Sequence, residues 1–181
     1  WLEMSASLFQ RIPPGAAGAA LLDPAIPGHE FEVLHGLSYV IDLSREARFH
    51  PDGTLRSARN RRTGDIRWNG YPIDDDQIFV VAVSSFRAGG GGHFTGLRDA
   101  QRLPMPPVTI RDALRDYLSG RLPKDPLADA PHPWRFAPMP GTRVSVRTGP
   151  GAAKHLAEVE TRGVQSLGID DGGFLRLSVP L

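Results

Sequence analysis

The chain has 181 residues, among them 20 glycines and 17 prolines, and its formal net charge at pH 7 is +1. This length fits one domain with a substantial core, and the near-neutral charge gives no electrostatic reason to expect a nucleic-acid polymer or an anionic membrane as a partner. The absence of cysteine excludes disulfides, thiolate nucleophiles and cysteine-ligated zinc, and no apolar run approaches the ~18 residues that span a bilayer.

The first quarter of the chain contains two predicted regular elements. Apolar residues crowd Trp1–Gln10, which predicts a helix that ends before the proline pair at 13 and 14. No capping residue precedes this helix, so we expect a fragment whose N-terminal part lies upstream of Trp1. Small residues without periodicity fill positions 16–28, a pattern typical of a connection, and the apolar run 37–43 predicts a strand.

A polar stretch and a hairpin follow. The polar stretch carries six arginines, which are Arg45, Arg48, Arg56, Arg59, Arg61 and Arg62. Such a cluster is either a solvated turn or a surface that faces phosphate, and the sequence leaves both interpretations open. Residues 66–73 contain Asn69-Gly70, a dipeptide that fits a tight hairpin turn, between two short strand-like runs.

Four successive glycines are the most informative feature of the chain. Gly89, Gly90, Gly91 and Gly92 lie between two phenylalanines and follow the apolar run 78–83, which predicts a buried strand. Each glycine loses more conformational freedom on folding than other residues do, and in return it allows a close approach to the backbone. The run is therefore either a ligand-binding loop at the end of a strand or a surface loop that binds nothing.

The second half of the chain mixes helices and strands. A helix is predicted to begin at Thr109, with Asp112 in the spacing of a capping box, and residues 123–133 read as a proline-rich linker. Later strands are predicted over 134–136, 143–147 and 174–179, with a helix over 150–159. This mixture, without regular alternation, predicts an α+β fold with a mixed sheet and packed helices, in a single domain over residues 1–181.

The sequence offers no catalytic constellation. Its six histidines are scattered without metal-ligand spacing, and Gly28-His29-Glu30 resembles a metallophosphoesterase fragment that lacks its asparagine. Asp74-Asp75-Asp76 is either a cation site or a solvated turn. There is no Gly-x-Ser-x-Gly motif, and no Gly-Lys-Ser/Thr follows the glycines, so the run is not a P-loop. We therefore assign no catalytic residue and no metal ligand, and we expect binding rather than chemistry.

Several segments, in their order and spacing, resemble the C-terminal domain of the 5′-nucleotidase family. They are Trp1–Ala6, Phe31–Leu43, Asn69–Asp74 and Phe86–Phe94, and within the family the glycine run and Trp134–Pro138 most resemble the periplasmic 2′,3′-cyclic-nucleotide 2′-phosphodiesterase/3′-nucleotidase branch. The resemblance implies that an N-terminal metallophosphoesterase domain, absent from this fragment, holds two divalent metals. It also implies that the present domain binds the nucleotide or nucleoside, needs no cofactor of its own, and is periplasmic.

The resemblance also assigns site residues. The family stacks the nucleobase between two aromatics, which correspond to Phe31 and Phe86, and the adjoining Arg87 and the glycines Gly89, Gly90, Gly91 and Gly92 complete the substrate-binding set. Phe31 is either a stacking ring or a core residue, and Arg87 either holds the loop or reaches a phosphate. Where 5′-nucleotidases carry an aspartate that accepts hydrogen bonds from the ribose, this chain has Gly92, which favours the cyclic-nucleotide branch.

We therefore expect the substrate-binding domain of a two-metal phosphoesterase that hydrolyses 2′,3′-cyclic nucleotides and 3′-nucleotides, inactive as an isolated fragment. Two alternatives stay open. One is the C-terminal domain of a 5′-nucleotidase or nucleotide-sugar hydrolase, and the other is a stand-alone module that binds nucleotides without catalysis. The expected partners are the nucleotide and the chain's own N-terminal catalytic domain, with no nucleic-acid polymer and no membrane.

Overall fold

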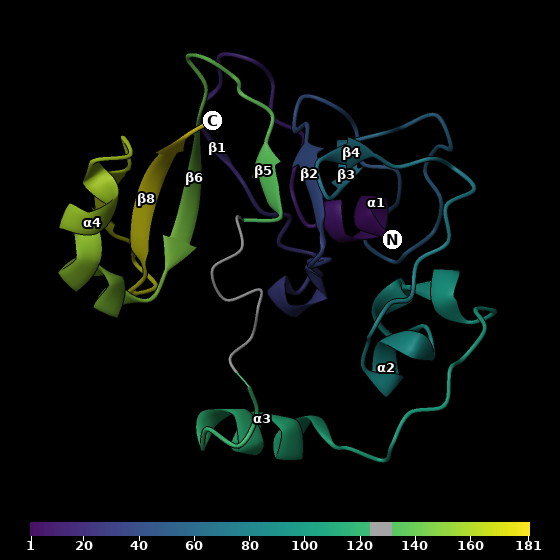
Figure 1. The fold of residues 1–181 in the computed structure, drawn as a ribbon. Coiled ribbons are helices and arrows are strands. Elements are labelled where there is room, and N and C mark those ends of the chain that lie inside the picture. Colours follow the sequence, from purple (N-terminus) through teal and green to yellow (C-terminus); the bar gives the residue numbers. More distant parts are fainter. Residues whose placement is uncertain (124–131) are drawn as a thin grey trace.

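The computed structural model describes residues 1–123 and 132–181, and its strands form two four-stranded sheets (Figure 1). One sheet has the order β1-β6-β8-β7 and the other β4-β3-β2-β5. The strands are β1 Ala17–Ala20, β2 Leu37–Ile41, β3 Thr63–Trp68, β4 Tyr71–Pro72, β5 Trp134–Phe136, β6 Arg143–Thr148, β7 Gln165–Ile169 and β8 Leu175–Pro180. Each sheet combines one parallel pair, β1 with β6 and β2 with β5, with antiparallel pairs. The α+β class is confirmed, with the strands divided between two mixed sheets.

The helices are short and lie between the strands in the chain. They are α1 Leu2–Ala6, α2 Ser85–Ala88, α3 Ile110–Leu118 and α4 Leu156–Glu160, together with 3₁₀ turns at Gly28–Glu30, Gly91–His93, Thr95–Leu97 and Pro150–His155. The helix predicted over 150–159 is present as a 3₁₀ turn that leads directly into α4. The high glycine and proline content accounts for elements of this length.

The N-terminal helix is shorter than the sequence predicts. α1 ends at Ala6, and Phe9 pairs with Leu22 in an isolated antiparallel bridge. The amide of Gln10 donates a hydrogen bond to the carbonyl oxygen of Leu21 at 2.9 Å. Because these backbone groups find partners in another segment, the chain gains nothing by continuing the helix to Gln10.

The core lies where α1 and the segment after it pack against both sheets. Its most buried side chains include Ile12 after α1, Leu43 after β2 and Val144 in β6. A cluster of aromatic rings continues this core, with centroid separations from 5.1 to 6.0 Å, and its members are Phe9, Phe31, Trp134 and Phe136. The edge-on and tilted arrangements in this cluster are the ones that aromatic quadrupoles favour.

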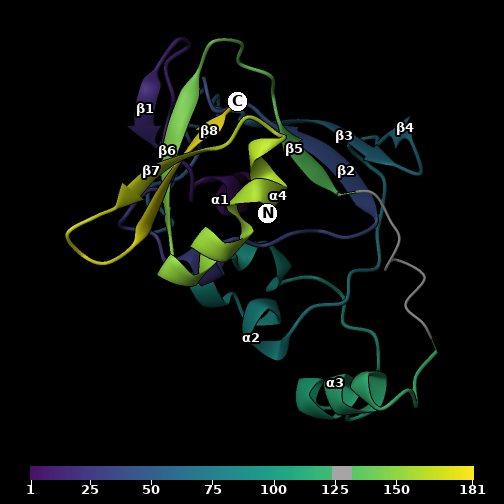
Figure 2. The same cartoon turned by 90° about the vertical axis from the view of Figure 1, so that its left-hand side faces the viewer.

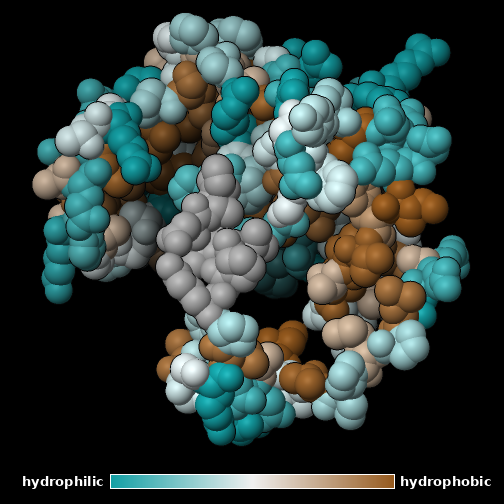
Figure 3. Space-filling model, viewed as in Figure 1, coloured by the Kyte–Doolittle hydropathy of each residue, from teal (hydrophilic) through white to brown (hydrophobic). Residues whose placement is uncertain are grey.

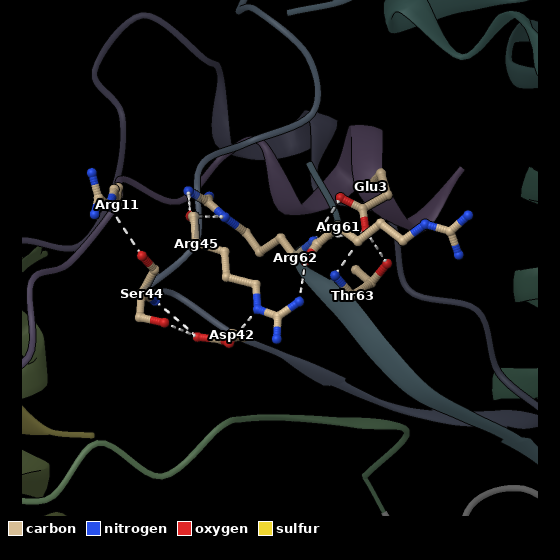
Figure 4. Close-up of polar contacts among 8 residues, drawn as sticks. All are labelled: Glu3, Arg11, Asp42, Ser44, Arg45, Arg61, Arg62 and Thr63. Carbon is tan, nitrogen blue, oxygen red and sulfur yellow. Dashed lines mark hydrogen bonds and ion pairs between the residues drawn. The ribbon is translucent and has the colours of Figure 1, made fainter. Parts of the chain in front are cut away.

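One of the six clustered arginines is buried beneath α1 (Figure 4). The guanidinium of Arg62 donates hydrogen bonds to the carbonyl oxygens of Ala6 and Phe9, where α1 has ended. In return, the Glu3 carboxylate accepts hydrogen bonds from the amides of Arg62 and Thr63. Burial lowers the pKa of the Arg62 guanidinium. The interpretation of the whole stretch as a solvated turn is therefore wrong for Arg62, because its buried side chain donates hydrogen bonds to backbone carbonyl oxygens of α1 and of the segment after it.

The prediction of a buried strand over residues 78–83 is wrong. These residues form no strand, and Ile78 and Val80 are 92% and 82% exposed. Within the described residues no strand pairs with this run, so its backbone lacks the partner that a β-ladder requires. Conversely, β1 lies inside residues 16–28, which the sequence predicts to be a connection. β7 has no counterpart among the predicted strands.

Local signals with a clear turn or cap chemistry are confirmed. Asn69 and Gly70 adopt φ values of 51° and 82° between β3 and β4, as a tight hairpin turn requires. The Thr109 hydroxyl accepts a hydrogen bond from the amide of Asp112 at 3.1 Å and caps α3. The strands predicted in the C-terminal part of the chain appear as β5, β6 and β8.

α3 lies apart from both sheets in two perpendicular views (Figures 1 and 2). Its apolar residues Ile110, Leu114 and Leu118 are exposed, and Figure 3 shows apolar surface on this part of the molecule. In the described part of the chain, no helix has the length and apolar character to cross a membrane. Most of the predicted linker, residues 124–131, lies outside the described residues.

Candidate functional site

The glycine segment, Ser84–Phe94, begins with α2. The hydroxyl of Ser84 accepts a hydrogen bond from the amide of Arg87 at 3.3 Å, so this serine is the N-cap of the helix. Gly90 and Gly92 adopt left-handed φ values of 85° and 64°. A residue with a Cβ is strained at such angles, which accounts for two of the four glycines.

Arg87 joins this segment to the 3₁₀ turn at Gly28–Glu30 and the residues after it. Its side chain is 7% exposed, and its Nε forms an ion pair with the carboxylate of Glu32. Its Nη1 donates to the carbonyl oxygen of Gly91 at 2.9 Å, and its Nη2 donates to that of His29 at 3.0 Å. Of the two roles that the sequence leaves open for Arg87, this geometry supports the one that holds the loop, because each guanidinium nitrogen already has a protein acceptor.

Two aromatic rings lie close to the Arg87 guanidinium. Its Cζ lies 4.7 Å from the ring centroid of Phe94 and 5.4 Å from that of Phe86. Phe94 is buried and its ring lies 4.6 Å from that of Trp1, whereas Phe86 is 63% exposed. The cation therefore contacts one buried ring and one exposed ring, at distances where cation–π attraction is significant.

The glycine backbone is closely approached, and the groups that approach it are side chains of the same chain. A Cβ at Gly92 would overlap Nη1 of Arg87, and a Cβ at Gly91 would overlap the ring of Phe86. A Cβ at Gly90 would overlap the Nε of Arg98. Side chains thus pack on the α-carbons of three of the four glycines, and the buried Arg87 has the least freedom to move away.

The two aromatics assigned by resemblance differ in their surroundings. The Phe31 ring is half-buried and meets the rings of Phe9 and Trp134 edge-on, at 5.1 and 5.2 Å. Phe86 lies on the surface beside the glycines. Among the described residues, the aromatic pairs in contact do not include Phe31 with Phe86. A sandwich of a base between these two rings therefore stays a prediction.

Within the described residues, no group of three or more histidine, aspartate and glutamate side chains lies close enough to hold a metal ion. His29 and Glu30 belong to a 3₁₀ turn, and the carbonyl of His29 serves Arg87. Asp74, Asp75 and Asp76 are exposed. The described residues therefore do not fit a two-metal centre.

Two surface hollows lie at the arginine stretch. One of about 300 Å³ is lined by Arg11, Glu46, Arg56 and Arg62 among others, and one of about 290 Å³ by Arg11, Arg45, Arg59 and Arg61. Their arginines are largely occupied, because Glu46 pairs with both Arg11 and Arg56 and Asp42 pairs with Arg45. Figure 4 shows the Arg61 side chain extending away from Arg11 and Arg45, so the guanidinium groups drawn do not converge on one point.

Two ionisable groups near β2 have shifted pKa values. Burial raises the pKa of the Tyr39 hydroxyl to about 12, and a contact with the backbone of Leu34 offsets part of this effect. Burial also acts to raise the pKa of Asp42, but hydrogen bonds from Ser44 and the Arg45 guanidinium outweigh it, and the net shift is downward. Neither group lies in the glycine segment.

Sequence reasoning missed Glu32 and Phe94 as partners of Arg87. Glu32 directly follows the assigned Phe31, and Phe94 closes the glycine segment, yet neither position carries a pattern that predicts the contact. An ion pair between residues 55 positions apart has no local signature.

Comparison with known proteins identifies relatives over the whole chain. A family model described as the 5′-nucleotidase C-terminal domain matches residues 9–99, a range that includes the glycine segment. A trifunctional nucleotide phosphoesterase protein of Bacillus subtilis is 33% identical over 80% of this chain and 10% of its own length. The 2′,3′-cyclic-nucleotide 2′-phosphodiesterases/3′-nucleotidases of Haemophilus influenzae and Salmonella typhimurium are 31% and 28% identical over 100% of this chain and 29% of their own lengths. The chain thus spans less than a third of these relatives, and no solved structure matches it.

Proposed function

Because the chain belongs to the 5′-nucleotidase C-terminal domain family, we propose that it is the substrate-binding domain of a larger nucleotide phosphoesterase. The proposed substrates are 2′,3′-cyclic nucleotides and 3′-nucleotides, the substrates that the names of two relatives specify for those proteins. The observation that carries the proposal is the glycine segment, which lies within the matched residues and presents the exposed ring of Phe86.

Phe86 supplies the stacking surface in this proposal. Its ring packs on the α-carbon of Gly91 and beside the Arg87 guanidinium, and yet it is 63% exposed. A ring that is held in place before binding loses little rotamer entropy when a base arrives. Stacking on an aromatic side chain is worth roughly 1–3 kcal/mol per base, enough for a weak nucleoside site.

Phe31 is the second aromatic of the proposal. It lies between His29 and Glu32, the two residues that Arg87 ties to the glycine segment. Its segment is therefore held beside the one that carries Phe86. Because the Phe31 ring also packs on Phe9 and Trp134, its substitution changes both folding and binding, whereas substitution of Phe86 tests binding more directly.

Gly92 is weaker evidence for a cyclic-nucleotide substrate than the sequence alone indicates. An aspartate there would combine a strained φ with overlap on Arg87. The glycine is thus accounted for sterically, and the preference for cyclic over 5′ substrates rests on the relatives. The chemical step is proposed for an N-terminal metallophosphoesterase domain with two divalent metals, outside the described residues, in a periplasmic enzyme.

A titration with adenosine tests the binding role, with amide chemical shifts as the readout. We expect a dissociation constant around millimolar, which corresponds to roughly 4 kcal/mol. Phe86→Ala should weaken binding about 5- to 100-fold, the loss of one stacking contact. Phe174→Ala is the matched control, because Phe174 is also exposed and also lies beside an arginine, Arg147. Equal effects of the two substitutions would refute the role of Phe86.

A hydrolysis assay tests the choice of substrate. The full-length enzyme with added manganese should hydrolyse 2′,3′-cyclic AMP and 3′-AMP with a higher kcat/KM than 5′-AMP, and a chelator should abolish turnover. A higher kcat/KM for 5′-AMP would assign the chain to the 5′-nucleotidase alternative. Turnover by the 181-residue chain alone would place the catalytic residues within it and contradict the proposed division of labour.

A further inference from the structure

Four side chains of the glycine segment and the N-terminus contact one another in series, and we call this series the column. The rings of Trp1 and Phe94 lie 4.6 Å apart with their planes tilted by 48°, and the Arg87 Cζ lies 4.7 Å from the Phe94 centroid. The Phe86 ring follows at 5.4 Å from the same guanidinium and ends the column at the surface. The column is thus buried at one end and open at the other.

The Arg87 position within this column is fixed by several contacts. Glu32 and the carbonyl oxygens of His29 and Gly91 accept its hydrogen bonds, and its Cζ lies over the rings of Phe94 and Phe86. The absence of a side chain at Gly92 makes room for its Nη1. A planar cation that donates several hydrogen bonds and lies over aromatic rings is a role that arginine fills better than lysine.

From this arrangement we infer that a nucleobase binds as the next member of the column, that Arg87 is the positioning residue for it, and that the site favours purines. The inference rests on the proposed function and specifies its ligand. Arg87 touches Phe86 and acts on the base through that ring.

The preference for purines follows from the electrostatics of the column. An aromatic ring has a negative face, and a cation on one side draws electron density toward itself. The open side of the Phe86 ring is thereby made less negative, which favours an electron-rich ring stacked on it. A purine is both larger and richer in π electrons than a pyrimidine, so overlap and electrostatics act in the same direction.

The experiment compares four nucleosides on the full-length protein, with binding followed by chemical shifts of the glycine segment. Adenosine and guanosine should bind about 3- to 10-fold more tightly than cytidine and uridine. Arg87→Met, which removes the cation, should reduce this ratio to near one. Arg87→Lys keeps a cation without the fork of donors and should retain part of the ratio even where it weakens all four ligands. A ratio cancels a general loss of binding, so a purely structural role of Arg87 would leave it unchanged.

Arg147→Met is the control, because Arg147 likewise pairs with an aspartate and lies 4.5 Å from the Phe174 centroid. It should leave the purine-to-pyrimidine ratio as in the parent protein. If Phe86→Ala weakens binding but the parent ratio is one, the inference fails and the proposed function stands. If no nucleoside binds, both the proposed function and this inference fail. In either case, Phe86 ring resonances that stay unshifted in Arg87→Met would show independently that Arg87 does not position that ring.

Discussion

Arg87 and Glu32 lie 55 positions apart in the chain and form an ion pair between Nε and Oε1. The arginine side chain is 7% exposed and the glutamate side chain 31%, so solvent reaches the glutamate but hardly reaches the arginine. This contact joins the segment that carries Phe31 to the segment that carries Phe86. The two segments that carry the aromatics assigned by the family resemblance are therefore joined by this ion pair.

Arg87→Met should lower the free energy of unfolding by about 3 kcal/mol, because it leaves the Glu32 carboxylate and two carbonyl oxygens without donors. Urea denaturation measures the change. Arg147→Met should cost no more than ~1 kcal/mol, since the Arg147–Asp170 pair has a 58% exposed arginine. Equal losses for the two variants would contradict the structural importance of Arg87.

Gly92→Ala should destabilise the protein by about 1–3 kcal/mol, because alanine is strained at a φ of 64° and its Cβ would overlap Arg87. Gly96→Ala is the matched control in the next turn, where nothing lies within 4 Å of the added methyl group and φ is not left-handed. Thermal unfolding of both variants decides the matter. A Gly92→Ala protein as stable as Gly96→Ala would show that Arg87 does not occupy that space.

Arg62→Met should lower the free energy of unfolding by about 3 kcal/mol, since in a buried site the carbonyl oxygen of Phe9 loses its donor and that of Ala6 loses one of two. The neighbouring Arg61→Met provides the control. The Arg61 side chain is exposed, and its substitution should change stability by less than ~0.5 kcal/mol. Similar costs at the two positions would mean that Arg62 does not support α1.

Stability should fall at alkaline pH because of Tyr39. The raised pKa of about 12 means that the folded protein holds the phenolic proton more tightly than the unfolded chain does. The stability gained in this way is complete below pH 10 and is lost as pH rises from 10 to about 12, and two pKa units correspond to about 2–3 kcal/mol. Denaturation measured at several pH values between 9 and 12 follows the loss.

Tyr39→Phe should remove that alkaline loss and leave stability near pH 8 unchanged or slightly higher, because the buried hydroxyl makes no hydrogen bond of ordinary geometry. Tyr71→Phe, at an exposed position in β4, should retain the alkaline loss. A pH profile of Tyr39→Phe identical to that of the parent would assign the effect to other groups.

Features that depend on neighbouring residues could be predicted from the sequence. Asn69-Gly70 forms a hairpin turn because its backbone angles suit those residue types in any context, and Thr109 caps α3 because its hydroxyl reaches an amide three residues ahead. The glycine run correctly indicated a close approach to the backbone. The identity of the approaching groups was not predictable, because Arg87 and Phe86 turn back onto glycines through tertiary geometry.

The sequence by itself determined the family, the α+β class and the local turns and caps, since each of these depends on residue types at short, fixed spacing. Only the tertiary structure decided which residues are buried and what they contact. The apolar run 78–83 has the composition of a strand, but no strand of residues 1–123 and 132–181 pairs with its backbone. Arg62 belongs to a stretch with the composition of a solvated turn, but its side chain is buried below α1. In both cases a long-range partner, present or missing, outweighs the intrinsic preference of the residue, because burial and hydrogen bonding depend on what the rest of the chain brings to that position.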